Sequence, residues 1–240
     1  MNCTIDAKLL SNIVESIKDL NPHVNFDFNE SGLHFQIMDT AHVSLSHLSL
    51  PKDTFKEYSC KKTMALGINL RSLNFVLKGS KGDVTMQSKA DKVKICVEKN
   101  SGSAIYMLHL LDVEGDYLDL PSEAYDAKAV IGSYAFGKVM KDMSEFSDTC
   151  HIHIQDQLSV SASGDIGQVE WKSTESECHA DACTPPLLFS LPYLQLFSKA
   201  STVSKQIVLE MKGEQPLRIT FPVGSGFLRF YLAPKIEDDE

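Results

Sequence analysis

The chain has 240 residues, which is enough for two domains of roughly 100–130 residues each. With 43% hydrophobic and 23% charged residues it has the composition of a globular protein, and no apolar run reaches the roughly 18 residues of a membrane span. The formal net charge of −9 argues against a uniformly basic nucleic-acid binder, although it is compatible with a basic patch on an acidic body.

The N-terminal stretch predicts no signal peptide, because acids and amides interrupt its apolar residues and no basic region precedes them. The six cysteines are scattered, and none forms a Cys-x-x-Cys pair. We therefore expect reduced thiols and a reducing compartment, the cytoplasm or the nucleus.

The first predicted element is a helix, because Leu10, Ile13, Val14 and Ile17 have the i, i+3, i+4, i+7 spacing of one buried stripe. A second short amphipathic helix is predicted from Leu70. Alternating apolar residues, separated by turn residues as at 81–83, predict strands in this half of the chain at 32–37, 42–50, 84–86, 93–97 and 104–111.

An acidic segment with Gly and Pro and no clear period follows these strands at 113–124, and it reads as a linker. Its few apolar residues suggest that something docks on it. We therefore predict an N-terminal domain over 1–112, a connector over 113–124 and a C-terminal domain over 125–240.

The second half repeats the first. Phe136, Val139, Met140 and Met143 reproduce the spacing of the first helix at an offset of 126, and the stretch from Leu191 reproduces the one from Leu70 at an offset of 121. Strands are predicted in this half at 150–154, 157–162, 206–211, 217–221 and 227–232. The pattern indicates a duplicated α+β module with two short helices per copy packed on antiparallel sheets.

Basic residues lie on the helical segments or just before them, whereas acids gather in the linker and the tail. If the helices share one face, that face is neutral to basic and suits weak, sequence-independent contact with phosphates. An ordinary solvated helix surface explains the same pattern. The basic residues concerned are Lys8, Lys18, Lys61, Lys62, Arg71, Lys78, Lys138, Lys141 and Lys199.

The sequence carries no motif typical of catalysis. There is neither a nucleotide-binding Gly-x4-Gly-Lys-Ser/Thr loop nor a Gly-x-Ser-x-Gly elbow. His151 and His153 with Cys178, His179 and Cys183 could together form a metal site, but their spacing matches no ligand signature. We expect no enzyme activity, no metal and no cofactor.

Several stretches resemble the proliferating cell nuclear antigen family, the eukaryotic DNA sliding clamps. These are LRFYLAPKIEDDE from Leu228, MALGINLRSLNFVLK from Met64, MDTAHVSL from Met38, SASGDIG from Ser161 and LPYLQLFSKA from Leu191. They occur in the family's order and cover essentially the whole chain. The resemblance implies two clamp domains per chain and a homotrimeric ring around duplex DNA, with the sheets outside and the helices lining the hole.

The resemblance also implies site residues. Those expected to face DNA are Lys18, Lys61, Lys62, Arg71, Lys78, Lys138, Lys141 and Lys199. A pocket for an apolar-aromatic peptide is expected from Met38, His42, Leu45, Leu118, Leu120, Pro121, Pro216, Tyr231, Leu232 and Ala233. Implied partners are duplex DNA, DNA polymerase, other proteins with the clamp-binding motif and a clamp-loader ATPase, with no membrane, in the nucleus.

Three departures from the family pattern bear on this expectation. Paired channel lysines of the family fall here on Ser11 and Asn12, and another falls on Phe75, so a less basic hole is expected. The ring-closing strand of the second domain is expected within 175–183, which is poor in β-formers and is followed by two prolines. The alternative is therefore a clamp-related scaffold that binds partners without forming its own homotrimer.

Overall fold

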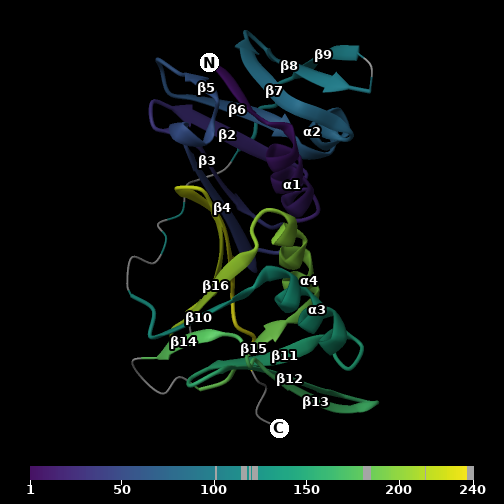
Figure 1. Ribbon diagram of the computed structural model, residues 1–240, viewed down its shortest axis with the longest axis vertical. Coiled ribbons are helices and arrows are strands. Elements are labelled where there is room, and N and C mark those ends of the chain that lie inside the picture. Colours follow the sequence, from purple (N-terminus) through teal and green to yellow (C-terminus); the bar gives the residue numbers. More distant parts are fainter. Residues whose placement is uncertain are drawn as a thin grey trace. The chain divides into compact units, whose positions relative to one another are not determined.

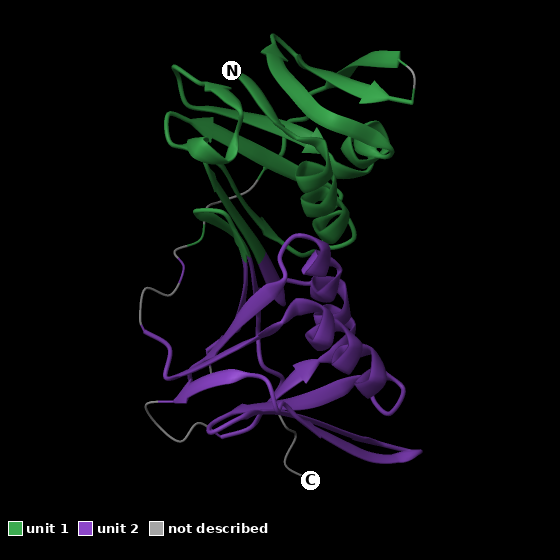
Figure 2. Cartoon of the chain, in the orientation of Figure 1, with its two compact units in different colours: residues 1–40, 46–118, 222–228 green, residues 41–45, 119–221, 229–240 purple. Residues whose placement is uncertain are grey.

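The computed structural model describes residues 1–100, 102–114, 118, 120, 124–180, 185–213 and 215–236 (Figure 1). The chain forms two compact units (Figure 2). Unit 1 consists of residues 1–40, 46–118 and 222–228, and unit 2 of residues 41–45, 119–221 and 229–240. Each half of the sequence therefore contributes a short segment to the unit built mainly by the other half. In the described part of the chain, no helix is long and apolar enough to span a membrane.

Unit 1 contains helices α1 (Ala7–Ile17) and α2 (Leu70–Leu77). Its first sheet has the strand order β5 (Glu57–Ser59), β1 (Asn2–Asp6), β7 (Ser80–Lys89), β8 (Lys92–Lys99) and β9 (Gly102–His109). A second run of adjacent strands has the order β4 (Ser44–Pro51), β3 (Gly32–Met38), β2 (His23–Asn29) and β6 (Met64–Asn69). A short 3-10 helix, η1 (Lys52–Thr54), follows β4.

Both helices of unit 1 begin at a side-chain cap. The Asp6 carboxylate accepts from the Leu9 N–H at 2.7 Å, and the Asn69 amide oxygen accepts from the Ser72 N–H at 2.9 Å. The predicted stripe of α1 from Leu10 to Ile17 is buried, as are Leu70 and Leu73 of α2. The two helices pack against each other in the same unit.

Unit 2 repeats this plan with α3 (Ser133–Ser144) and α4 (Leu191–Ser198), which also pack together. Its smaller sheet has the order β13 (Gly167–Lys172), β12 (Leu158–Gly164), β11 (Thr149–Ile154) and β15 (Leu187–Ser190). The other strands lie in the order β14 (Glu177–Ala180), β10 (Ala127–Gly132), β16 (Gln206–Met211), β17 (Leu217–Val223) and β18 (Gly226–Leu232). A 3-10 turn, η2 (Lys199–Thr202), follows α4.

The duplication predicted from the sequence is confirmed by the order of the elements. Each half reads strand, helix, five strands, helix and three strands. The strand orders also correspond, since β5-β1-β7-β8-β9 matches β14-β10-β16-β17-β18, and β4-β3-β2-β6 matches β13-β12-β11-β15. The α+β class with antiparallel sheets and two short helices per module is therefore confirmed.

The exchanged segments complete the strands of the unit that receives them. In unit 1, a Cβ atom on Gly226 would lie 2.2 Å from the Ser49 carbonyl oxygen, so this glycine allows close approach to β4. In unit 2, the Ala233 N–H donates to the Val43 carbonyl at 3.1 Å. Strands β18 and β4 are consequently neighbours in the strand order.

Candidate functional site

Four of the basic residues expected to face DNA project from unit 1 into solvent. Arg71 lies on α2 and Lys78 caps its C-terminal end, while Lys61 and Lys62 lie between β5 and β6. All four side chains are exposed. Exposed basic side chains of this kind can contact phosphate groups, and such contacts carry no sequence information.

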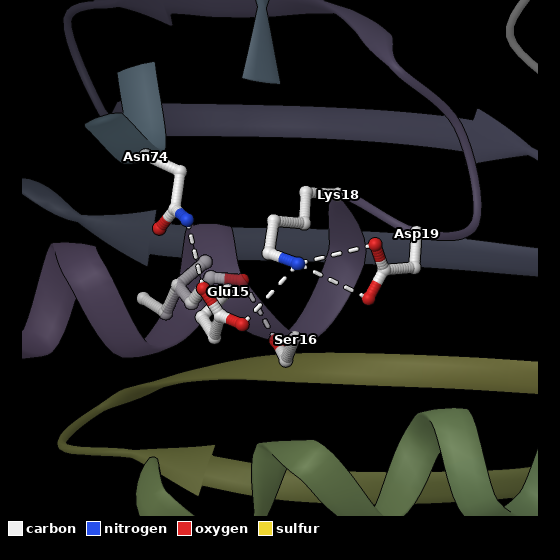
Figure 3. Close-up of polar contacts among 6 residues, drawn as sticks. Glu15, Ser16, Lys18, Asp19 and Asn74 are labelled. Atoms are coloured by element: carbon white, nitrogen blue, oxygen red, sulfur yellow. Dashed lines mark hydrogen bonds and ion pairs between the residues drawn. The ribbon is translucent and has the colours of Figure 1, made fainter. Parts of the chain in front are cut away.

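Lys18 is the fifth residue of unit 1 that was expected to face DNA, and it forms ion pairs with two acidic residues (Figure 3). Its ammonium lies 3.2 Å from a Glu15 oxygen and 3.1 Å from an Asp19 oxygen, and its side chain is only 19% exposed. Desolvation lowers the pKa of Lys18. The hydrogen bonds to Asp19 and Glu15 and the charges of these two acids together raise the pKa by more than that, so the net shift is upward. Lys18 is therefore charged but already balanced, and it is the least available of these residues for a phosphate.

Glu15 also ties the two helices of unit 1 together. Its second carboxylate oxygen accepts from the Asn74 side-chain amide at 2.8 Å, which joins α1 to α2 (Figure 3). Sequence reasoning identified Lys18 but missed this arrangement. The acids at i−3 and i+1 were the signal that its charge is compensated.

Three further basic residues are exposed in unit 2. Lys138 and Lys141 line a shallow groove between α3 and the end of α4, and Lys199 follows α4. Tyr134, Gly137, Asp142, Ser198 and Ser201 complete the groove lining. Where α3 meets α4, a Cβ atom on Gly137 would lie 3.4 Å from the Ser198 Cβ, which is an ordinary van der Waals contact, and the Gln195 amide donates to the Ser144 hydroxyl at 2.6 Å.

Three helix positions where the family pattern has lysine carry uncharged residues in this chain. Ser11 and Asn12 are partly exposed on α1, and Phe75 on α2 is 70% exposed. The ammonium of Lys99 lies 5.8 Å from the centre of the Phe75 ring. Lysine at these three positions would make the helix surface of unit 1 more basic than it is in this chain.

The segment after β9 is anchored along unit 1 by hydrogen bonds that its own backbone makes to backbone carbonyls and to two side chains. The Leu111 N–H donates to the Gly67 carbonyl at 2.8 Å, and the Asn25 amide donates to the Val113 carbonyl at 2.8 Å. Further along, the Leu118 N–H donates to Gln36 Oε1 at 2.9 Å and the Gln36 amide donates back to the Leu118 carbonyl at 3.3 Å. Leu118 is thereby held at β3 with its side chain 41% exposed.

The close crossing at Gly67 predicts a specific sensitivity. A Cβ atom on Gly67 would lie 2.0 Å from the Leu111 carbonyl oxygen, so Gly67→Ala is expected to lower the free energy of unfolding by about 1–3 kcal/mol. Urea denaturation measures this change. Gly102→Ala is the matched control, because nothing lies within 4 Å of its Cβ position. Equal stability of the two variants would contradict the crossing.

The candidate pocket residues differ in how accessible they are. In unit 1, Met38 is partly exposed at the end of β3, where its carbonyl accepts from the Asn21 amide at 3.2 Å. In unit 2, His42 is exposed with a φ of 58°, and Leu120, Pro216 and Ala233 are partly exposed. The buried candidates, whose side chains belong to the core, are Leu45, Tyr231 and Leu232. Pro121 lies outside the described residues.

Pro216 is held by a neighbouring aromatic residue. The Tyr125 hydroxyl donates to the Pro216 carbonyl at 3.3 Å, and the Arg218 guanidinium stacks 4.1 Å from the Tyr125 ring centre. Arg218 makes two hydrogen bonds to Glu210, at 2.7 and 2.8 Å. Burial raises the pKa of Tyr125 to about 12, so its hydroxyl remains a donor at neutral pH.

Two family models match the chain consecutively. The model described as proliferating cell nuclear antigen, N-terminal domain, matches residues 4–117, and the corresponding C-terminal domain matches residues 119–236. The proliferating cell nuclear antigen of Chaetomium thermophilum is 34% identical over an alignment of 251 positions, gaps included, which covers 98% of this chain and 97% of that protein. The chain belongs to the proliferating cell nuclear antigen family. It is a DNA sliding clamp.

The residues of the metal hypothesis are distributed over two strands of unit 2 and a part of the chain outside the described residues. Among the described residues, no group of three or more His, Cys, Asp or Glu side chains is placed to hold a metal ion. His151 and His153 lie on β11, and Cys178 and His179 lie on β14. Cys183, the remaining member of the proposed cluster, lies outside the described residues.

Sequence reasoning missed the residues that hold the clamp's connector. Gln36 and Asn25 bind segments that follow them by 82 and 88 residues, and neither belongs to a recognisable motif. Gly67 lies within the family-like stretch from Met64, but its role in the crossing was not predicted. A glycine within a β-rich run was the available signal for close backbone approach.

Proposed function

We propose that three copies of this clamp close into a ring around duplex DNA and tether replication and repair enzymes to it. The observation that carries the proposal is the internal repeat together with the position of two of the strands that lie at sheet edges. Among the described strands, β9 ends the first sheet of unit 1 and β13 ends the smaller sheet of unit 2. An exposed strand edge is a template for pairing with another chain.

The repeat identifies which edges would pair. By order in the repeat, β9 corresponds to β18 and β13 corresponds to β4, and β18 and β4 are neighbours within the chain. Pairing β9 of one copy with β13 of the next would reproduce that neighbourhood between chains. The contact uses two different surfaces, so it is head-to-tail and closes a ring if the rotation fits.

This proposal replaces the expected ring-closing strand within 175–183. That region contains β14, Glu177–Ala180, which pairs with β10 and corresponds in the repeat to β5. The strand proposed here contains Val169 and Trp171, both good β-formers, where 175–183 has none of comparable strength. The low strand propensity of 175–183, which favoured a non-trimeric scaffold, therefore concerns β14 and not the strand proposed to close the ring.

The exposed basic residues on and beside the helices support contact with DNA phosphates. We propose that Lys61, Lys62, Arg71, Lys78, Lys138, Lys141 and Lys199 make such contacts, and that Lys18 contributes less because Glu15 and Asp19 balance it. An acidic chain remains on DNA because a closed ring encloses the duplex rather than gripping it. Opening the ring would require a separate loader ATPase, and the clamp itself would act as a nuclear scaffold rather than an enzyme.

Partner proteins would dock on the connector. We propose that Leu118, held at β3 in unit 1, contacts an apolar-aromatic peptide carried by polymerases and other clamp-binding proteins. Met38 is a further candidate contact in unit 1, and Leu120, His42, Pro216 and Ala233 are candidate contacts in unit 2. The anchoring of Leu118 by Gln36 supports this role, since a fixed backbone lowers the entropic cost of binding.

The solution mass tests the ring. One chain has a mass of 26.6 kDa, and sedimentation at micromolar concentration is expected to give three times that value. The trimer should also be retained on nicked circular DNA after loading and released when the circle is linearised. A mass of 26.6 kDa at every concentration would instead support the scaffold alternative.

A further inference from the structure

The single tryptophan of the chain lies on the proposed ring-closing strand. Trp171 is partly exposed on β13. In the pairing of β13 with β12, Trp171 lies opposite Val160 and Val169 lies opposite Ala162, and both partners are buried. Trp171 and Val169 therefore share the core-side face of the sheet, while Gln168, Glu170 and Lys172 are exposed on the other face.

An apolar groove lies beside the other open strand, within unit 1. It is lined by Arg71, Ser72, Phe75 and Val76 of α2 and by Tyr106 and Leu108 of β9. Tyr106 and Leu108 lie opposite the buried Ile95 and Val93, so they too are on the core side of their sheet. The groove is therefore open at the edge strand.

The aromatic side chains of this groove are only partly covered within the chain. Phe75 is 70% exposed, although Lys99 places its ammonium 5.8 Å from the Phe75 ring centre and 5.3 Å from that of Tyr106. Phe75, Tyr106 and Leu108 together form a contiguous apolar surface beside an open strand, and surfaces of this kind are typical of contact sites.

Strand β18 corresponds to β9 in the repeat, and it shows how an aromatic residue on this strand packs when a further strand lies beside it. Strand β18 carries Phe230, which is fully buried, stacks on Phe197 at 4.5 Å and meets Phe221 edge-on at 5.8 Å. Strand β4 is its neighbour. In unit 1, β9 has no described neighbour on that side.

We infer that Trp171 of one copy packs into the groove formed by Phe75, Tyr106 and Leu108 of the next copy. The inference rests on the proposed ring, in which β13 and β9 run side by side with their core-side faces continuous. The indole then lies beside Tyr106 and against Phe75, forming an aromatic cluster that spans the two chains. Aromatic pairs add to the stability gained from burying their area, and Trp and Tyr are enriched among residues that dominate interface energy.

The fluorescence of Trp171 can report directly on the proposed contact. As the clamp is diluted from the trimer to the monomer, the Trp171 emission is expected to move to longer wavelength, in step with the fall in sedimentation mass. Acrylamide should quench the monomer more strongly than the trimer. Because there is one tryptophan in the chain, the signal has a single origin.

Two variants separate this contact from the ring itself. Phe75→Ala and Trp171→Ala are each expected to raise the trimer dissociation constant by about 30-fold or more. Phe75 is mostly exposed, so its variant tests the contact even if Trp171→Ala fails to fold. The matched control is Tyr134→Ala, which removes an 81% exposed aromatic outside this groove and should leave the constant unchanged.

The outcomes distinguish the two proposals. A wild-type trimer whose emission does not change on dilution, and which Phe75→Ala does not weaken, would overturn the aromatic contact and leave the ring intact. A wild-type monomer at all concentrations would overturn the ring. The expected result is that Phe75→Ala lowers the sedimentation mass and moves the emission to longer wavelength together, with Tyr134→Ala unchanged.

Discussion

Replacing Leu118 with aspartate is expected to weaken binding of a clamp-binding peptide by about 100-fold or more. The side chain is 41% exposed in the free clamp, and its backbone donates one hydrogen bond to Gln36 and accepts one from it, so its position is defined before a peptide arrives. A carboxylate covered by an apolar peptide loses its hydration without gaining a partner, which costs several kcal/mol. Isothermal titration with a peptide bearing the apolar-aromatic motif measures the change.

The chain offers a close control for this variant. Leu111 is 39% exposed just before the connector, but it lies beside Gly67 and outside the proposed pocket. Leu111→Asp should therefore bind the peptide as the wild type does. If Leu118→Asp retained full affinity, or if both variants lost it equally, the pocket would be assigned to the wrong part of the chain.

The double change Lys78→Gln, Lys141→Gln is expected to weaken DNA binding and to flatten its salt dependence. The slope of log affinity against log salt should fall by roughly 0.9 for each phosphate that is no longer neutralised, because fewer counterions are released. Anisotropy of a labelled duplex at several salt concentrations gives the slope, and polymerase stimulation should fall with it. Peptide binding should be unchanged, since neither lysine belongs to the proposed pocket.

Lys18→Gln is the matched control for the charge. Its ammonium is already paired with Glu15 and Asp19, so removing it should change the salt slope far less than Lys141→Gln does. A change as large as that of Lys141→Gln would mean that the ion pairs open when DNA binds. An unchanged slope in the double variant would refute the DNA-facing assignment of Lys78 and Lys141.

The helices were predictable because each has a local signature. The stripes starting at Leu10, Phe136, Leu70 and Leu191 all form helices, and each predicted start falls within three residues of the observed one. A periodicity of 3.6 residues depends only on neighbours along the chain, so it can be recognised without knowledge of the fold. The duplication was predictable for the same reason.

Some strands were harder to predict. Strand β10 was missed because Ala127 and Ala129 occupy two of its three buried positions, beside Ile131, and alanine is a weak strand signal. The turn expected at 81–83 was wrong, since these residues lie inside β7 where the register shifts between Lys81 and Val84. Gly82, with a φ of 64°, forms an irregularity within the strand rather than its end.

The candidate site was predicted mainly from the family pattern. The basic residues and the peptide-contact residues come from that resemblance and stay predictions, whereas the hydrogen bonds between Gln36 and Leu118 and between Asn74 and Glu15 join residues 82 and 59 positions apart. No local pattern encodes such pairs. The choice between β13 and 175–183 as the ring-closing strand likewise needed the strand order, because correspondence within the repeat cannot be read from strand propensity.

The exchanged segments have a consequence for how the chain folds as it is made. Unit 1 includes residues 222–228, so its last piece leaves the ribosome only when nearly the whole protein has been synthesised. Most of the N-terminal half emerges long before that piece and must wait with the β4 edge uncovered. Synthesis of the second half therefore separates the early part of unit 1 from the segment that completes it, and both units are completed almost together.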